Sequence, residues 1–143
     1  MGQQQLLLLV LGIVIVGLAV VVGIQAFGEN QKKANADALV NDAIRIASDA
    51  QAWKLKPAAF GGGANETGFE NLSLPQMGYE LTDGAYENLN GRFSIAATAA
   101  SVIITGNSLP DSGNDNQVVV TVAGTAPTDI GTVVSTVDDA SGS

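Results

Sequence analysis

The fold is decided by residues 6–24, LLLLVLGIVIVGLAVVVGI, in which every residue is apolar or glycine. This run of 19 residues is close to the ~20 residues that a helix needs to cross the hydrocarbon core of a bilayer. No Lys or Arg precedes the run and no A-x-A cleavage site follows it, so it does not have the pattern of a secretory signal peptide. We therefore expect the segment to stay on the mature chain as a helix.

Helical periodicity continues beyond the apolar run. Apolar residues recur at alternating spacings of three and four from Ala36 to Trp53, and no proline occurs before Pro57. This spacing places them along one side of a helix, and proline is a natural stop. We expect one helix over residues 3–56, in which residues 1–28 are the hydrophobic part and residues 29–56 the amphipathic part. The amphipathic part should pack on a folded head through Leu39, Ala43, Ile46, Ala50 and Trp53.

The rest of the chain predicts a small β-sheet head. Residues 57–91 are rich in turn formers and are expected to be a connecting loop, with a flexible stretch at 60–65. Residues 92–143 contain strand-like runs at 92–97, 101–105, 117–123 and about 131–137, in which Val118, Val120 and Val122 alternate with outward positions. An antiparallel sheet of three or four strands packed on the helix would give an α+β fold.

The composition excludes several classes of function. The chain has no His and no Cys, so it lacks the usual general base, the commonest metal ligand and any disulfide. No nucleophile and base are paired in the sequence, so we expect no enzymatic activity, no metal and no cofactor. From Pro57 onward ten acidic residues face the single base Arg92, and this acidic balance argues against binding nucleic acid.

The remaining motifs carry little weight. The loop 111–116, DSGNDN, has several oxygen ligands, but it lacks the EF-hand spacing, so a hairpin turn is the favoured interpretation over a Ca²⁺ loop. Asn65 and Asn71 lie in N-x-S/T sequons. Glycines 61–63 follow no strand and carry no Lys-Ser/Thr, so they do not form a phosphate-binding loop. Four aromatic residues are expected to pack in the core rather than form a stacking surface: Trp53, Phe60, Phe69 and Tyr79.

The hydrophobic half of the helix has no obvious partner in the monomer. It must be covered by lipid or by other copies of the chain. Gly12, Gly17, Gly23 and Gly28 each cost roughly 1 kcal/mol relative to Ala in a helix interior, and small residues allow neighbouring helices to approach closely. Glycine is also common in membrane helices, so both interpretations stay open.

The start MGQQQLLLLVLGIVIVGLAVVVGI, followed by a long amphipathic helix and a β-rich part, resembles the type IV pilin superfamily, which includes the pseudopilins of type II secretion. The likeness covers residues 1–56. It implies a helical homopolymer built from the N-terminal helices, a precursor held in the inner membrane, an assembly machinery as partner, and an extracellular filament on the cell surface.

The chain departs from the family pattern at its start. The family commonly has Glu at the fifth mature position, whereas Gln5 stands fifth from Met1; cleavage after Gly2 would instead make Leu7 the fifth residue. No proline interrupts the apolar helix, where only glycine is available. By this resemblance and the apolar pattern, the assembly interface is predicted to consist of Gln5, Leu6, Leu9, Gly12, Ile13, Val16, Gly17, Val20, Gly23 and Ile24.

Two functions are compatible with these features. The first is a filament subunit with a structural role in adhesion or motility. The alternative is a membrane-anchored minor pilin or pseudopilin of a secretion system. Lys32 and Lys33, just after the apolar run, would hold the C-terminal side of a plain anchor in the cytoplasm, whereas a pilin leaves the membrane on assembly.

Overall fold

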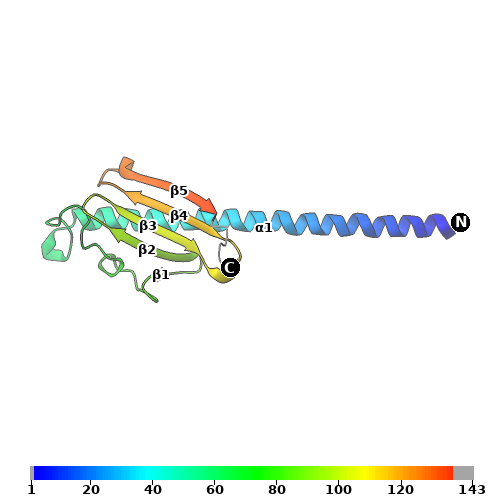
Figure 1. The fold of residues 1–143 in the computed structure, drawn as a ribbon, viewed down its shortest axis with the longest axis horizontal. Helices are drawn as coiled ribbons and strands as arrows, with labels where there is room; N and C mark the ends of the chain where they lie inside the picture. The colour runs from blue at the N-terminus through cyan, green and yellow to red at the C-terminus, as the bar shows by residue number, and fades with distance from the viewer. Residues whose placement is uncertain (1, 137–143) are drawn as a thin grey trace, which may run out of the picture. The chain divides into compact units, whose positions relative to one another are not determined.

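The computed structural model of the protein describes residues 2–136, which form one long helix followed by one antiparallel sheet (Figure 1). The predicted α+β fold is therefore confirmed. The elements are α1 (Gly2–Leu55), β1 (Tyr86–Glu87), β2 (Gly91–Ala97), β3 (Val102–Ser108), β4 (Asn116–Val122) and β5 (Ile130–Thr136).

The helix α1 has nearly the predicted bounds. It ends at Leu55, because Pro57 cannot continue the ladder of backbone hydrogen bonds. Contacts divide the chain between Lys33 and Ala34 into two compact units. Below, described residues 2–33 are called the N-terminal unit and described residues 34–136 the head unit, and each is considered by itself.

The sheet is a simple antiparallel meander in the order β1-β2-β3-β4-β5. The strands β2 and β4 begin one residue earlier than predicted, and β4 also ends one residue earlier. The strand β3 runs to Ser108 rather than to residue 105. Residues 106–108 were not predicted as part of the strand because Gly106 is a poor strand former. In the sheet Gly106 pairs with Phe93, and a Cβ at Gly106 would lie 2.6 Å from Phe93 Cε1.

The core of the head unit lies between the second part of α1 and one face of the sheet. Side chains of β3 and β4 alternate between buried and partly exposed positions, so Val118, Val120 and Val122 are buried while Val119 and Thr121 are not. Figure 1 shows β2, β3 and β4 lying along this part of the helix. The helix contributes Leu39, Ala43, Ile46, Ala47, Ala50 and Trp53 to the core.

The segment 57–91 does more than connect the helix to the sheet. It contains the two-residue strand β1, and it buries Phe69, Leu72 and Leu74 in the core. One residue of the stretch 60–65, which was predicted to be flexible, is packed: the Gly63 amide donates to the carbonyl of Trp53 at 2.8 Å and the residue lies against the indole. Phe60 is not a core residue, since 72% of it is exposed at the end of a 3-10 turn.

The fourth predicted strand corresponds to β5, which begins at Ile130. Its predicted last residue, Val137, and the remaining predicted head residues 138–143 lie outside the described residues.

Candidate assembly surface

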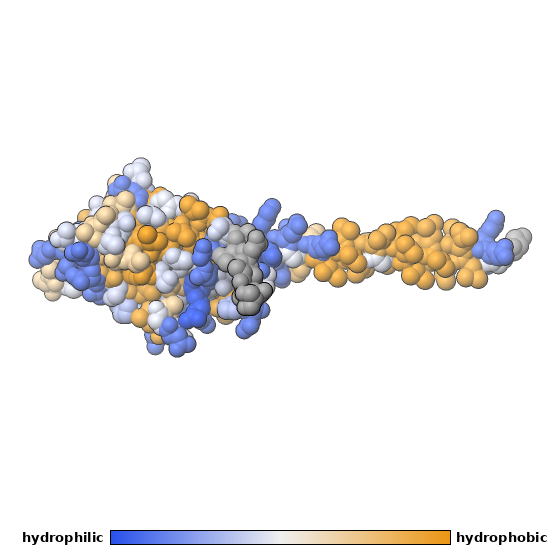
Figure 2. Space-filling model, viewed as in Figure 1, coloured by the Kyte–Doolittle hydropathy of each residue, from blue (hydrophilic) through white to orange (hydrophobic). Residues whose placement is uncertain are grey.

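The surface of the N-terminal unit is apolar on every side of the helix. Each residue from Gly2 to Phe27 is exposed, and the large apolar side chains between Leu6 and Ile24 expose 51–70% of their area. Figure 2 shows this stretch as a continuous apolar surface, bounded by hydrophilic residues at both ends. The helix is long and apolar enough to cross a membrane.

The predicted assembly residues share one side of this helix. At 3.6 residues per turn, positions 5, 9, 16, 20 and 23 fall close together, and the whole predicted set spans about 140° of the circumference. All of them are exposed. The opposite side, which includes Leu8, Leu11 and Ile15, is equally apolar and exposed. Exposure therefore does not separate the predicted side from the others, and the assignment of this side stays a prediction.

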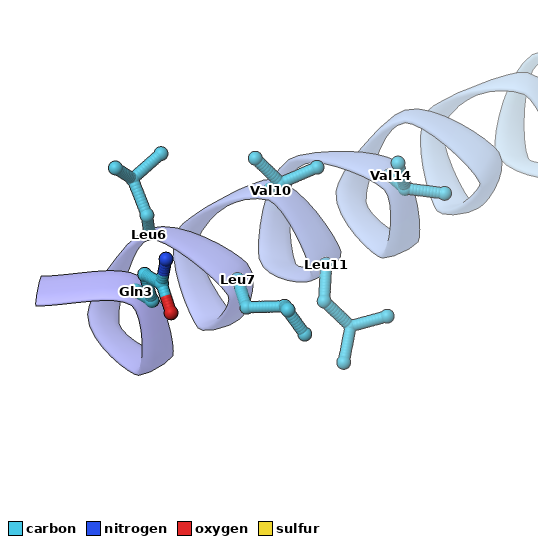
Figure 3. Close-up of a pocket in the computed structure, with 6 residues that line it drawn as sticks. All are labelled: Gln3, Leu6, Leu7, Val10, Leu11 and Val14. Atoms are coloured by element: carbon cyan, nitrogen blue, oxygen red, sulfur yellow. The ribbon is translucent and has the colours of Figure 1, made fainter. Parts of the chain in front are cut away.

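A shallow groove runs between two rows of side chains near the start of the helix (Figure 3). One row contains Leu6, Val10 and Val14, and the other contains Gln3, Leu7 and Leu11. Members of each row are four residues apart, which is the spacing of the ridges that interdigitate when two helices pack. A side chain from a second helix is the kind of group that such a groove accepts.

The interior glycines of the N-terminal unit have no role in packing within it. A Cβ added at Gly12, Gly17, Gly23 or Gly28 would meet nothing within 4 Å. Each glycine lowers the stability of the helix relative to alanine, and no close contact among the described residues compensates for that loss. Close approach of another helix would explain these glycines.

Gln5 begins the predicted side as an exposed polar residue one turn before Leu9. Its place as the fifth residue is counted from Met1, which is outside the described residues.

On the head unit, the structure buries every residue that the sequence assigned to helix-to-head packing: Leu39, Ala43, Ile46, Ala50 and Trp53. Polar contacts that the sequence did not reveal border this apolar stripe. The Asn35 amide donates to the carbonyl of Asn90 at 2.9 Å and accepts from the buried Asn116 at 3.1 Å. Asn88 and Asn90 both donate to Asp42 at 2.9 Å. This asparagine cluster joins α1 to the β1–β2 turn and to the start of β4, so it fixes the sheet's register on the helix.

A second polar contact joins α1 to the segment 57–91. The Tyr79 hydroxyl donates to the Asp49 carboxylate. Burial raises the pKa of Tyr79 well above its usual value of 10.0, and the hydrogen bond to Asp49 raises that pKa further. These asparagines and Tyr79 do not recur in the sequence at a helical or strand spacing. Their hydrogen-bond partners are therefore seen only in the folded structure.

The weaker candidate sites of the sequence all lie in the head unit. In the loop 111–116, the Ser112 hydroxyl oxygen accepts from the Asn114 amide at 3.3 Å, and the Asn116 side-chain amide donates to Asn35. Among residues 2–136, no group of three or more acidic residues is placed to hold a metal ion. Asn65 is exposed, while the exposed Asn71 donates to Glu66 at 2.9 Å.

Comparison of the chain with protein-family models, with curated proteins and with solved structures gives no match.

Proposed function

We propose that this chain is the structural subunit of an extracellular filament of the type IV pilin kind, in which the N-terminal helices of many copies form the core. The observation that carries the proposal is the wholly apolar, wholly exposed surface of residues 6–24. Full burial of one Leu, Ile or Val side chain contributes about 1.5 to 3 kcal/mol, so covering this surface is strongly favourable. A long apolar N-terminal helix followed by an antiparallel sheet is compatible with a pilin-like fold.

Two features favour other copies of the chain over lipid as the final cover. The glycines at 12, 17, 23 and 28 leave room that another helix can use and that a fluid lipid tail does not require. The basic residues Lys32 and Lys33 follow the apolar run after residues 25–31, an arrangement that disfavours a permanent anchor with an exported head. The membrane then holds the precursor, and assembly moves the helix from lipid into the filament core.

The second candidate is a membrane-anchored minor pilin or pseudopilin. The length and apolar character of the helix favour this candidate, because a single copy that spans a bilayer has its apolar surface covered by lipid. In that case the chain would stay in the membrane fraction and would form no long polymer.

Negative-stain microscopy of material sheared from cells that express the chain separates these candidates. The proposal expects thin, unbranched filaments in the sheared fraction that react with an antibody against the head unit. Recovery of the whole chain in the membrane fraction, with no filaments at comparable expression, would support the anchored alternative instead.

A further inference from the structure

The two edges of the sheet differ in how they are protected. At one edge, β1 is only two residues long, and an ion pair between Glu87 and Arg92 at 3.2 Å lies across it. Very short strands and charged side chains are ordinary devices that prevent edge-to-edge pairing. The other edge, β5, is seven residues long and pairs with β4 along its whole length.

The strand β5 lacks those protective devices. Its sequence, IGTVVST, contains no charge and no proline, and five of its seven residues are β-branched Ile, Val or Thr. Val133 and Val134 expose 64% and 49% of their area. Within residues 2–136 no strand pairs with the outer edge of β5. A long, uncharged edge of this kind is a template for another strand.

The hydrogen-bond pattern shows which backbone groups that edge offers. The Ala123 amide donates to the Asp129 carbonyl at 2.9 Å, so the pair next to the first residues of β5 is a hydrogen-bonded pair. Such pairs alternate along an antiparallel ladder. Gly131, Val133 and Ser135 therefore direct their amides and carbonyls toward β4, in register with Thr121, Val119 and Gln117. The backbone groups of the even-numbered residues, 130 to 136, point outward.

We infer that β5 pairs antiparallel with β5 of a second copy of this chain. One register overlaps both strands completely, and it brings the even-numbered residues of the two copies together as hydrogen-bonded pairs. In that register Val133 lies opposite Val133 of the second copy, as a pair without backbone hydrogen bonds, and Thr132 lies opposite Val134. The two copies of Val133, each exposed in the single chain, then contact each other on the sheet face away from α1.

Two copies of β5 can pair without local electrostatic repulsion. Since β5 has no charged residue, a second β5 brings no like charge opposite to it. The head as a whole is acidic, with ten acids and one base from Pro57 onward, so long-range repulsion opposes the contact at low salt. Added salt screens that repulsion and should strengthen the pairing.

This inference does not depend on the proposed filament. A two-fold contact is closed and cannot extend a polar polymer by itself, so it would join two unassembled copies or two neighbouring filaments. It can be tested in detergent micelles, which cover the apolar helix, using the full chain.

The absence of cysteine from the sequence makes disulfide trapping specific. Three single substitutions are compared: Val133→Cys at the centre of the inferred contact, Ser135→Cys on the same strand and face, and Ile103→Cys on the outer face of β3. Opposed residues in a pair without backbone hydrogen bonds lie about 4.5 Å apart at Cα, within disulfide range. Two copies of residue 135 would lie roughly 13 Å apart along the strands, which is beyond that range.

Under mild oxidation, Val133→Cys should give a covalent dimer on a non-reducing gel, and the other two variants should give little. The dimer yield should rise with salt. Circular dichroism of the three reduced proteins checks that each is folded. Equal yields at positions 133 and 135 would overturn the inference, since parallel pairing or random collision would produce them. No dimer at position 133, or a yield that falls with salt, would also overturn it.

Discussion

Gly63 packs directly against the indole ring of Trp53. A Cβ at position 63 would lie 2.2 Å from Trp53 Cζ3, while the Gly63 amide donates to the Trp53 carbonyl at 2.8 Å. The contact returns the chain onto the last turns of α1 after Pro57. The segment that follows contributes Phe69, Leu72 and Leu74 to the core.

Gly63→Ala should destabilise the head unit, because the added methyl group must displace the indole or the loop. Overpacking of this kind costs about 1 to 3 kcal/mol in the free energy of unfolding. The fluorescence of Trp53, the single tryptophan, reports the transition in a denaturant titration. Gly131→Ala is the control, since its Cβ would meet nothing within 4 Å. Equal stability of the two variants would show that the loop adjusts freely around Trp53.

Tyr79 should make the head unit less stable in alkali. Its pKa in the folded protein is raised above 10.0, so between the two values the unfolded state binds fewer protons than the folded state. The contribution is fully present below about pH 10 and decreases as the pH rises toward the folded pKa. Unfolding titrations at pH 8 to 11 measure this slope.

Tyr79→Phe should flatten the alkaline slope and cost about 1 kcal/mol at neutral pH, because the hydrogen bond to Asp49 is lost. Tyr86→Phe is the matched control, since the Tyr79 side chain and its hydrogen bond remain. An unchanged slope in Tyr79→Phe would mean that another group causes the alkaline loss.

The partly buried asparagine cluster should contribute to the stability of the head unit. Asn35→Ala removes one hydrogen bond to the Asn90 carbonyl and one from the buried Asn116 side chain, and each lost hydrogen bond costs about 0.5 to 1.5 kcal/mol. Asn41→Ala is the control on the same helix, at an exposed position with no side-chain hydrogen bond in the described structure. Denaturant titration of both variants should show a loss confined to Asn35→Ala.

Regular periodicity explains which parts of the fold the sequence could predict. The spacing from Ala36 to Trp53 predicted the buried side of α1, and the alternation around Val120 predicted the buried face of β4. The strand β1 was missed because a strand of two residues is too short to show an alternation of apolar and polar side chains. The predicted burial of Phe69 is confirmed, whereas Leu72 and Leu74 were missed because they reach the core from an irregular segment.

The candidate assembly surface, residues 6–24, could be predicted from the sequence only in part. The sequence identified residues 6–24 as apolar, and the structure places all of them on the surface. Periodicity cannot select one side of a helix that is apolar all round, so the side that meets a neighbour depends on the neighbour itself. The position of β5 as the outermost strand among residues 2–136 is also a property of the folded sheet, because only the strand order reveals it.

Removal of residues 1–28 should separate polymerisation from folding. The remaining chain keeps the whole buried side of α1, so circular dichroism should show a folded mixture of helix and strand. Light scattering should show a monomer, or at most a dimer joined through β5, and no larger species. An unfolded truncated chain would show that the hydrophobic half also stabilises the head unit.

A single buried charge provides the sharpest test of whether residues 6–24 form the dry core of a filament. Val16→Asp would place an unpaired carboxylate in that core, which is far costlier than the loss of methyl groups in Val16→Ala. Ile103→Asp places the same charge on the outer face of the sheet and serves as the control for charge alone.

The quantity to measure is the number of filaments per cell in negative-stain images at matched expression. We predict filaments from wild type, Val16→Ala and Ile103→Asp, and none from Val16→Asp, whose head unit should still be folded by limited proteolysis. Normal filaments from Val16→Asp would contradict a dry core built from this helix.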